Sequence, residues 1–261
     1  MRKYIPFLIV VALAAGVLFS CKRDYPVHSG YSGVAGYAFL KVVHASPNFR
    51  KIFNKPDSLN VFVGGIKVNG AALQYNTQFP TTTNSYFTVQ SGSQTIKLSV
   101  NGVTTSDSIT VLTLQKTMNA GSYYTLVITD SIQSTRDSSQ IWTQDAFPKP
   151  SLGPGYTYLR FVHAVMDDSA GTTVSLYSPR RNQTFFSKVK IDSITPFVAF
   201  PSILGSLDTL YVIKTNTGGI VAKFLPQGPL GDQRYYTAYY MGDTALAPAA
   251  KARTISLTQN K

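Results

Sequence analysis

Two histidines occupy matching sequence contexts and are the first residues of this chain that could support chemistry. The segment 39–45 reads Phe-Leu-Lys-Val-Val-His-Ala and the segment 158–164 reads Tyr-Leu-Arg-Phe-Val-His-Ala, so His44 and His163 stand at equivalent places. A metal centre needs three or four ligands, and a hydrolytic triad needs a nucleophile, a base and an orienting acid. Neither histidine has an aspartate partner, a cysteine or a second histidine within reach in sequence. We therefore expect both to be structural residues that tie a turn through ring hydrogen bonds, with no metal and no catalytic role.

The carboxylates form a second set of candidate ligands. All 12 acidic residues are aspartates, and Asp167, Asp168, Asp192 and Asp208 could supply the oxygen ligands that calcium prefers. They lack the regular alternation of a calcium loop, which argues against that site. A glycosidase needs a pair of carboxylates, and none is evident, while the sequence has no phosphate-binding glycine loop and no zinc motif. These observations argue against an enzyme and against a bound cofactor.

The densest group of basic residues comprises Arg180, Arg181, Lys188 and Lys190. With 24 basic and 12 acidic residues, the formal net charge of the chain is +12, so polyanions would be attracted to it. We take these four residues as candidates for contact with an anionic ligand such as an acidic polysaccharide. The alternative interpretation is a solvated basic loop with no ligand.

The N-terminal segment indicates where such a ligand would be met. Arg2 and Lys3 precede an apolar run over residues 5–19, and Ser20 then stands before Cys21, the one cysteine of the chain. An apolar run of about 15 residues is shorter than the roughly 20 that a membrane-spanning helix needs. This layout resembles a bacterial lipoprotein signal peptide. The resemblance implies that Cys21 carries a diacylglycerol group with fatty acids such as palmitate, and that residues 1–20 are removed. An ordinary secretory signal and a single-span anchor are the alternatives.

The residue after Cys21 bears on location. In Gram-negative lipoproteins an aspartate there usually marks retention in the inner membrane, whereas this chain has Lys22. The resemblance is to envelope lipoproteins of the Bacteroidota type and favours the outer membrane, with the periplasmic and surface faces both open. Export also separates the protein from cytoplasmic nucleic acid. The partners we expect are the membrane, reached through lipidated Cys21, and an acidic polysaccharide or an envelope protein.

An internal repeat organises the rest of the chain. Besides the histidine segments, Ser-Tyr-Tyr-Thr at 122–125 matches Arg-Tyr-Tyr-Thr at 234–237 at nearly the same spacing. A period of roughly a hundred residues favours duplicated domains over solenoids, whose periods are about 20 to 50 residues. The predicted organisation is a signal peptide at 1–20, a flexible tether at 21–36, a first domain at 37–149, a Pro/Gly linker at 150–155 and a second, divergent domain at 156–261.

The composition predicts an all-β fold. The sequence lacks glutamate, a good helix former, while Val, Thr and Tyr, which favour strands, recur throughout. Gly64-Gly65 and Asn101-Gly102 each follow an alternating strand and predict two-residue hairpins. Short strands separated by turn signals every eight to twelve residues or so are typical of a β-sandwich, although a closed barrel would fit the same period.

Three segments resemble a family of exported bacterial domains known as domain of unknown function 4397. They are the sequences at 42–47 (Val-Val-His-Ala-Ser-Pro), at 61–68 (Val-Phe-Val-Gly-Gly-Ile-Lys-Val) and at 120–127 (Ala-Gly-Ser-Tyr-Tyr-Thr-Leu-Val). The resemblance implies two tandem immunoglobulin-like antiparallel β-sandwiches on an envelope lipoprotein, with no catalytic residues to transfer. The function we expect is therefore a non-catalytic binding or adhesion module for a glycan or a protein. The alternatives are a structural component of an export or surface-assembly complex and, third, a hydrolase.

The lipoprotein interpretation predicts the fate of a single substitution. Cys21→Ala should abolish incorporation of radiolabelled palmitate, because no other thiol in the chain can accept the diacylglycerol group. The wild-type protein should partition into the detergent phase and the variant into the aqueous phase. Labelling of the variant, or an aqueous wild-type protein, would contradict the interpretation.

Overall fold

The structure is a computed structural model of the chain. It describes residues 36–47, 58–82, 84–100, 110–129, 140–148, 154–166, 168, 171–202, 209–225, 230–243 and 251–261. The predictions for the signal peptide, for Cys21, for the Asn101-Gly102 hairpin and for most of the linker lie outside these residues, as do Asp167 and Asp208. Within the described ranges the structure contains no helix long and apolar enough to cross a membrane.

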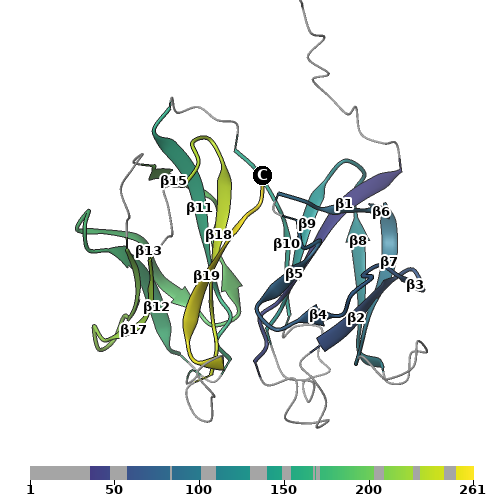
Figure 1. Ribbon diagram of the computed structural model, residues 1–261, viewed down its shortest axis with the longest axis horizontal. Helices are drawn as coiled ribbons and strands as arrows, with labels where there is room; N and C mark the ends of the chain where they lie inside the picture. The colour runs from purple at the N-terminus through teal and green to yellow at the C-terminus, as the bar shows by residue number, and fades with distance from the viewer. Residues whose placement is uncertain are drawn as a thin grey trace, which may run out of the picture.

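Ten strands form an N-terminal sandwich of two sheets (Figure 1). Sheet A has the order β10-β9-β1-β5, with β6 also paired to β1, and sheet B has the order β3-β2-β7-β8, with β4 also paired to β2. The strands are β1 (Tyr37–His44), β2 (Ser58–Val63), β3 (Ile66–Lys67), β4 (Leu73–Gln74), β5 (Thr77–Phe79), β6 (Phe87–Gln90), β7 (Gly92–Val100), β8 (Thr110–Met118), β9 (Tyr123–Ile128) and β10 (Ile141–Gln144).

Nine further strands form a C-terminal sandwich. Sheet C has the order β14-β11-β18-β19, with β15 also paired to β11, and sheet D has the order β13-β12-β16-β17. The strands are β11 (Tyr156–His163), β12 (Thr173–Ser178), β13 (Gln183–Lys190), β14 (Ser193–Ile194), β15 (Val198–Pro201), β16 (Leu210–Lys214), β17 (Ile220–Phe224), β18 (Tyr235–Met241) and β19 (Thr254–Gln259). The all-β sandwich prediction is confirmed.

Alternation of side chains along the strands builds each core. On β2, Leu59, Val61 and Val63 point into the sandwich and are buried, as are Ile96 and Leu98 on β7. The predicted hairpin after β2 is present: Gly64 and Gly65 have φ of 58° and 83°, values that glycine reaches without steric cost. Strand pairing thus follows the hydrophobic pattern that the sequence displays.

The two sandwiches share one departure from purely antiparallel pairing. β1 runs parallel to β9, with Lys41 opposite Thr125, and β11 runs parallel to β18, with Arg160 opposite Thr237. Parallel neighbours require a long crossover, which contains β2–β8 in the N-terminal sandwich and β12–β17 in the C-terminal sandwich. The matched pairing supports the predicted duplication, whose domain limits remain a prediction.

Sheets A and C pack face to face, so the molecule has four layers in the order B, A, C, D (Figure 1). On β1, Leu40 and Val42 enter the core of the N-terminal sandwich, whereas Val43 and Ala45 point the other way. They join a separate buried cluster between the sandwiches, which consists of Val43, Ala45, Val127, Ile141, Val162, Ala164, Tyr239 and Met241. We call this contact between sheets A and C the junction.

Candidate functional site: the junction and its grooves

Strand register places matching residues of the two sandwiches opposite one another across the junction. β6 pairs with β1 in the same register as β15 pairs with β11. The residue that follows β10 donates a backbone hydrogen bond to the first residue of β9, and the residue that follows β19 donates the equivalent bond to the first residue of β18. The matched pairs are Lys41 with Arg160, Tyr86 with Phe197, Thr125 with Thr237, and Asp145 with Asn260. The two halves are therefore related by an approximate two-fold axis that runs along the strands.

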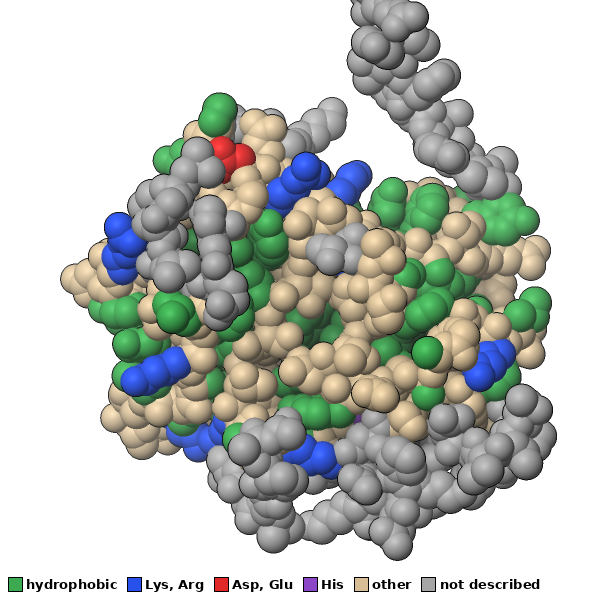
Figure 2. Space-filling view, in the orientation of Figure 1, with side chains coloured by type: hydrophobic (Ala, Val, Ile, Leu, Met, Phe, Trp, Pro, Cys, Tyr) green, Lys and Arg blue, Asp and Glu red, His purple; other side chains and the backbone are tan. Residues whose placement is uncertain are grey.

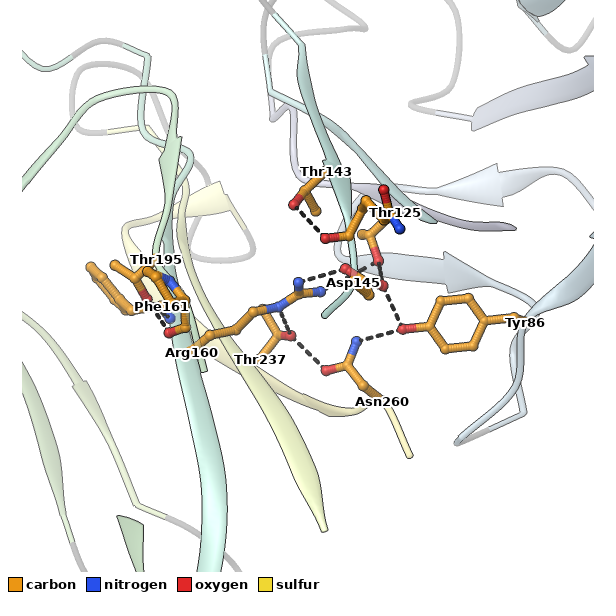
Figure 3. Close-up of polar contacts among 11 residues, drawn as sticks. Tyr86, Thr125, Thr143, Asp145, Arg160, Phe161, Thr195, Thr237 and Asn260 are labelled. Carbon is orange, nitrogen blue, oxygen red and sulfur yellow. Dashed lines mark hydrogen bonds and ion pairs between the residues drawn. The ribbon is translucent and has the colours of Figure 1, made fainter. Parts of the chain in front are cut away.

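A buried ion pair crosses the junction (Figure 3). The Nη1 atom of Arg160 lies 2.5 Å from Oδ1 of Asp145, and both side chains are at most 3% exposed. Arg160 also donates through Nε to Thr237 Oγ1 at 2.8 Å. The second carboxylate oxygen of Asp145 accepts hydrogen bonds from Tyr86 Oη at 2.7 Å and from Thr125 Oγ1 at 2.6 Å. Each nitrogen of Arg160 and each carboxylate oxygen of Asp145 thus has at least one hydrogen-bond partner.

The other half of the junction has the same layout but lacks the carboxylate. Thr237 donates to Oδ1 of Asn260 at 2.6 Å, as Thr125 donates to Asp145, and Asn260 donates through Nδ2 to Tyr86 at 3.1 Å. Lys41 has no acid in the place that Asp145 holds for Arg160; instead its ammonium donates to the Gln259 carbonyl oxygen at 3.3 Å. Among the described residues, this buried network therefore contains two cations, Lys41 and Arg160, and one carboxylate, Asp145.

Aromatic rings complete the matched pairs. The Lys41 ammonium lies 4.5 Å from the centre of the Tyr86 ring, and the Arg160 guanidinium lies 4.5 Å from that of Phe197. Cation–π contacts of this kind stabilise a desolvated cation by roughly 2 kcal/mol. They help to hold both basic groups at positions where water is excluded.

Burial and charge shift the pKa values of the network. Desolvation lowers the pKa of Lys41 to about 8, an effect that Asp145 partly offsets and Arg160 reinforces. Burial alone would lower the pKa of Arg160, but the Asp145 carboxylate, together with Tyr239 and Tyr86, outweighs burial and raises that pKa. Burial and the same carboxylate raise the pKa of Tyr86. At neutral pH Arg160 is therefore charged, and Tyr86 donates as a neutral hydroxyl.

Two grooves flank the junction at the places where sheet edges meet. The first, which we call the Phe147 groove, encloses about 460 Å³. It is lined by Thr143, Gln144, Ala146, Phe147, Pro148, Arg160, Ile194, Thr195, Pro196 and Phe197. The second, which we call the Leu257 groove, encloses about 290 Å³ and has β5 and β19 at its sides. The approximate two-fold axis exchanges the two grooves, because β10 matches β19 and β14 matches β5.

The grooves differ in their aromatic content. In the Phe147 groove the rings of Phe147 and Phe197 lie 5.5 Å apart and are half-buried. Phe147 also contacts Tyr235 and Tyr123, with ring centres 5.0 and 5.6 Å away. The Leu257 groove has Tyr239 on its wall, fully buried. The Phe147 groove therefore has two half-buried aromatic rings in its lining, whereas the one aromatic residue that lines the Leu257 groove is fully buried.

The two histidines lie at the ends of β1 and β11 and are fully buried. His163 has the acid partner that the sequence interpretation denied it: Nε2 is 3.1 Å from Oδ2 of Asp168, and Nδ1 is 3.2 Å from the Val189 carbonyl oxygen. Asp168 follows His163 after a short turn, so the spacing could have revealed the pair. The structural role of both histidines stays a prediction.

Asp168 is the centre of a second buried charge cluster. Its Oδ1 lies 2.7 Å from Arg253 and 3.2 Å from Lys214, besides the contact with His163. This carboxylate faces basic groups, which oppose the binding of a metal cation. Asp192, the other described calcium candidate, accepts a hydrogen bond from Thr129 at 3.0 Å. Within the described ranges no three His, Cys or Asp residues come together as a metal site.

The four basic candidates do not form one cluster. Arg180 and Arg181 lie in the turn between β12 and β13, whereas Lys188 and Lys190 lie near the far end of β13, a strand of 8 residues. At about 3.3 Å per residue the two pairs are roughly 25 Å apart. Arg181 donates to the Pro201 carbonyl oxygen at 2.7 Å and lies over the Phe200 ring. The four residues cannot all contact one small ligand.

These features define an all-β protein in which two sandwiches are joined by a buried, paired-sheet junction. The chain belongs to the family described as Domain of unknown function (DUF4397), which matches residues 38–170. The match spans the N-terminal sandwich and continues through β11. No protein with a curated description matches the sequence.

Solved structures offer only distant likenesses. The Bacillus anthracis TIE protein is 11% identical, with a TM-score of 0.22 over 80% of this chain, which spans 35% of that protein. The tip fimbrial protein Mfa3 from Porphyromonas gingivalis, with a C-terminal truncation, is 7% identical, with a TM-score of 0.22 over 85% of this chain and 99% of its own. Similarity at this level assigns no function to the chain.

The junction network predicts a large cost for removing its one carboxylate. Asp145→Asn leaves Arg160 buried without a counter-charge and should lower the free energy of unfolding by about 3–5 kcal/mol in urea denaturation. The double variant Asp145→Asn/Asn260→Asp moves the carboxylate to the matched position and should recover part of the loss. Equal stability of the wild type and the single variant would contradict the role assigned to the ion pair.

The buried histidines predict a loss of stability in acid. Burial, followed by the nearby Lys251, lowers the pKa of His44 to about 3, and burial also lowers the pKa of His163. An unfolded histidine titrates near 6.5, so between these values the unfolded chain binds more protons and stability falls as pH falls. His44→Gln should therefore flatten the decline measured between about pH 6.5 and about pH 4. His28→Gln, in the predicted tether, is the control and should leave the profile unchanged; a wild-type stability that is level over this range would refute the prediction.

Proposed function

We propose that this protein is a lipid-anchored, non-catalytic binding module of the cell envelope and that its Phe147 groove holds a saccharide chain. Lipidation of Cys21, followed by removal of residues 1–20, would fix it to the outer membrane. The tether at 21–36 would then present the two sandwiches, at 37–149 and 156–261, away from the lipid. The proposal assigns no reaction to the chain.

The observation that carries the proposal is the composition of the Phe147 groove. Two half-buried phenylalanine rings stand beside the hydroxyls of Thr143 and Thr195 and the exposed amide of Gln144. The faces of sugar rings carry C–H groups that pack on aromatic rings, while their hydroxyls exchange hydrogen bonds with amides and alcohols. An open groove of this kind, whose one charged lining residue, Arg160, is already paired with Asp145, suits a segment of a glycan.

The junction supports the proposal because it keeps the groove in one shape. One wall comes from the N-terminal sandwich through Thr143 and Phe147, and the other comes from the C-terminal sandwich through Thr195 and Phe197. The Arg160–Asp145 ion pair and the apolar cluster hold these walls together. A preformed groove loses little conformational entropy when a ligand binds.

The charged groups of the interior are engaged in structural contacts, which also supports a binding role. Asp145 and Asp168 are both buried against basic side chains. Their carboxylates contact Arg160 and Arg253 respectively, and neither aspartate is among the residues that line the Phe147 groove. The groove thus presents groups that can bind a ligand, whereas the two buried aspartates stabilise the fold.

The two-fold relation supplies a matched test of glycan binding. Thr143→Val/Gln144→Ala should weaken binding to a glycan identified on an array by about 10-fold, since each lost hydrogen bond costs about 0.5–1.5 kcal/mol. The control is Thr258→Val/Gln259→Ala, which alters the equivalent positions of the Leu257 groove and should leave the affinity unchanged. Equal losses in both variants, or no glycan bound by the wild type, would count against the proposal.

A further inference from the structure

We infer that the end of the molecule at which β1 and β11 begin is a membrane-docking surface that rests on anionic phospholipid headgroups. The inference deepens the proposed function, since it rests on the lipid anchor at Cys21 and names the face that the anchor brings to the bilayer. It concerns Tyr37, Tyr156, Arg180, Arg234 and Lys261, which we call the docking end.

The junction fixes both sandwiches so that this end is continuous. Lys41 and Arg160 lie at one level and Val43 and Val162 share the junction cluster, so β1 and β11 run in the same direction. Tyr37 and Tyr156 therefore occupy matched places at the same end. They are 42% and 39% exposed, and both belong to the few large apolar side chains of the described residues that face solvent.

Basic side chains accompany the two tyrosines. Arg234 is exposed directly before β18, and its carbonyl oxygen accepts from Tyr158 at 2.7 Å, which places it beside the start of β11. Lys261 is exposed, with its ammonium 5.4 Å from the Tyr123 ring centre. Arg180 is exposed in a turn that Arg181 ties to Pro201, the residue paired with Tyr156.

Acidic charge is scarce on the same surface. Figure 2 shows basic side chains at the upper edge of the molecule among hydrophobic ones, with a single acidic patch in view. In the described part of the chain, Asp232, half-buried, is the one partly exposed aspartate at this end. The docking end therefore combines aromatic and cationic groups with little to repel an anionic surface.

This combination suits the headgroup region of a bilayer. Tyrosine has an apolar ring and a polar hydroxyl and is enriched at membrane–water interfaces. Each lysine or arginine near an anionic lipid surface contributes about 1 kcal/mol to binding, which is roughly a 5-fold gain in affinity. The chain enters β1 at this end, and residues 22–36 span at most about 50 Å when fully extended. A lipid on Cys21 would therefore tether the molecule to the bilayer from the docking end.

The test uses the processed chain, residues 21–261 with Cys21→Ala, so that no acyl chain contributes to binding. We expect it to co-sediment with vesicles of phosphatidylcholine and phosphatidylglycerol mixed in equal amounts, and not with phosphatidylcholine alone. Binding should weaken as salt is raised, because the Debye length shrinks from about 10 Å at 0.1 M toward about 3 Å at 1 M. Binding to neutral vesicles, or to neither kind, would overturn the inference.

A pair of matched variants locates the surface. Arg180→Ser/Arg234→Ser should lower vesicle affinity by about 20-fold. Lys188→Asn/Lys190→Asn removes the same charge from the far end of β13, with asparagine chosen because Lys188 has φ of 53°, and should change affinity by less than about 2-fold. Equal losses in the two variants would show a non-specific charge effect and overturn the inference, as would tighter binding to a soluble acidic polysaccharide than to vesicles.

The anchor and the docking end can fail separately. Palmitate labelling of the wild type together with absent vesicle binding by the processed chain would refute the docking surface alone. Vesicle binding by the processed chain without labelling of the wild type would refute the anchor, and the docking end would then be the membrane contact by itself. Tyr37→Ser/Tyr156→Ser should reduce vesicle affinity by about the same factor at low and at high salt, since the contribution of the tyrosine rings is not screened.

Discussion

The buried ion pair between Arg160 and Asp145 is the interaction on which the arrangement of the whole molecule depends. Two charges taken out of water lose several kcal/mol of hydration each, and they persist only where geometry and further hydrogen bonds replace it. Thr125, Thr237 and Tyr86 supply those bonds, and they come from both sandwiches. Separating the sandwiches would part each charge from its partner and expose the apolar cluster of the junction to water. The pair therefore fixes how sheet A lies on sheet C, and with it the shape of both grooves and the docking end.

The approximate two-fold relation explains why the junction has this composition. A symmetric contact repeats every residue, so a cation at the position of Lys41 recurs at that of Arg160. The acid does not recur, because Asn260 stands where the symmetry would place a second Asp145. This difference leaves Lys41 with a pKa lowered by burial and gives the two halves distinct chemistry. The same divergence gives the Phe147 groove two half-buried aromatic rings and the Leu257 groove a buried tyrosine.

Sequence reasoning recovered the all-β class, the Gly64-Gly65 hairpin and the paired histidine strands, because each is written in local pattern. It missed the parallel pairing of β1 with β9, since the two strands are far apart in the chain and share no local turn signal. It also missed the junction. One signal was present: β1 and β18 read as nearly continuous apolar runs, which is the pattern of strands buried on both faces. A buried Lys41 within such a run marks a position where a second sheet must cover the strand.

The ion pair between Arg160 and Asp145 could not be predicted from spacing, because it forms across the linker between sheets whose packing the sequence does not encode locally. His163 and Asp168 are a different case, since they are close in the chain and the turn between them brings the carboxylate back to the ring. In both places an aspartate is buried in the interior. Few aspartates are left to offset the lysines and arginines of the surface, so the surface has the basic character expected from the composition.

Differential scanning calorimetry tests most directly whether the two sandwiches form one body. If the junction locks them together, the wild-type protein unfolds in a single transition whose calorimetric enthalpy equals its van't Hoff enthalpy. Two resolved transitions in the wild-type protein, each with its own midpoint, would show that the sandwiches unfold independently and would contradict the part assigned to Arg160 and Asp145.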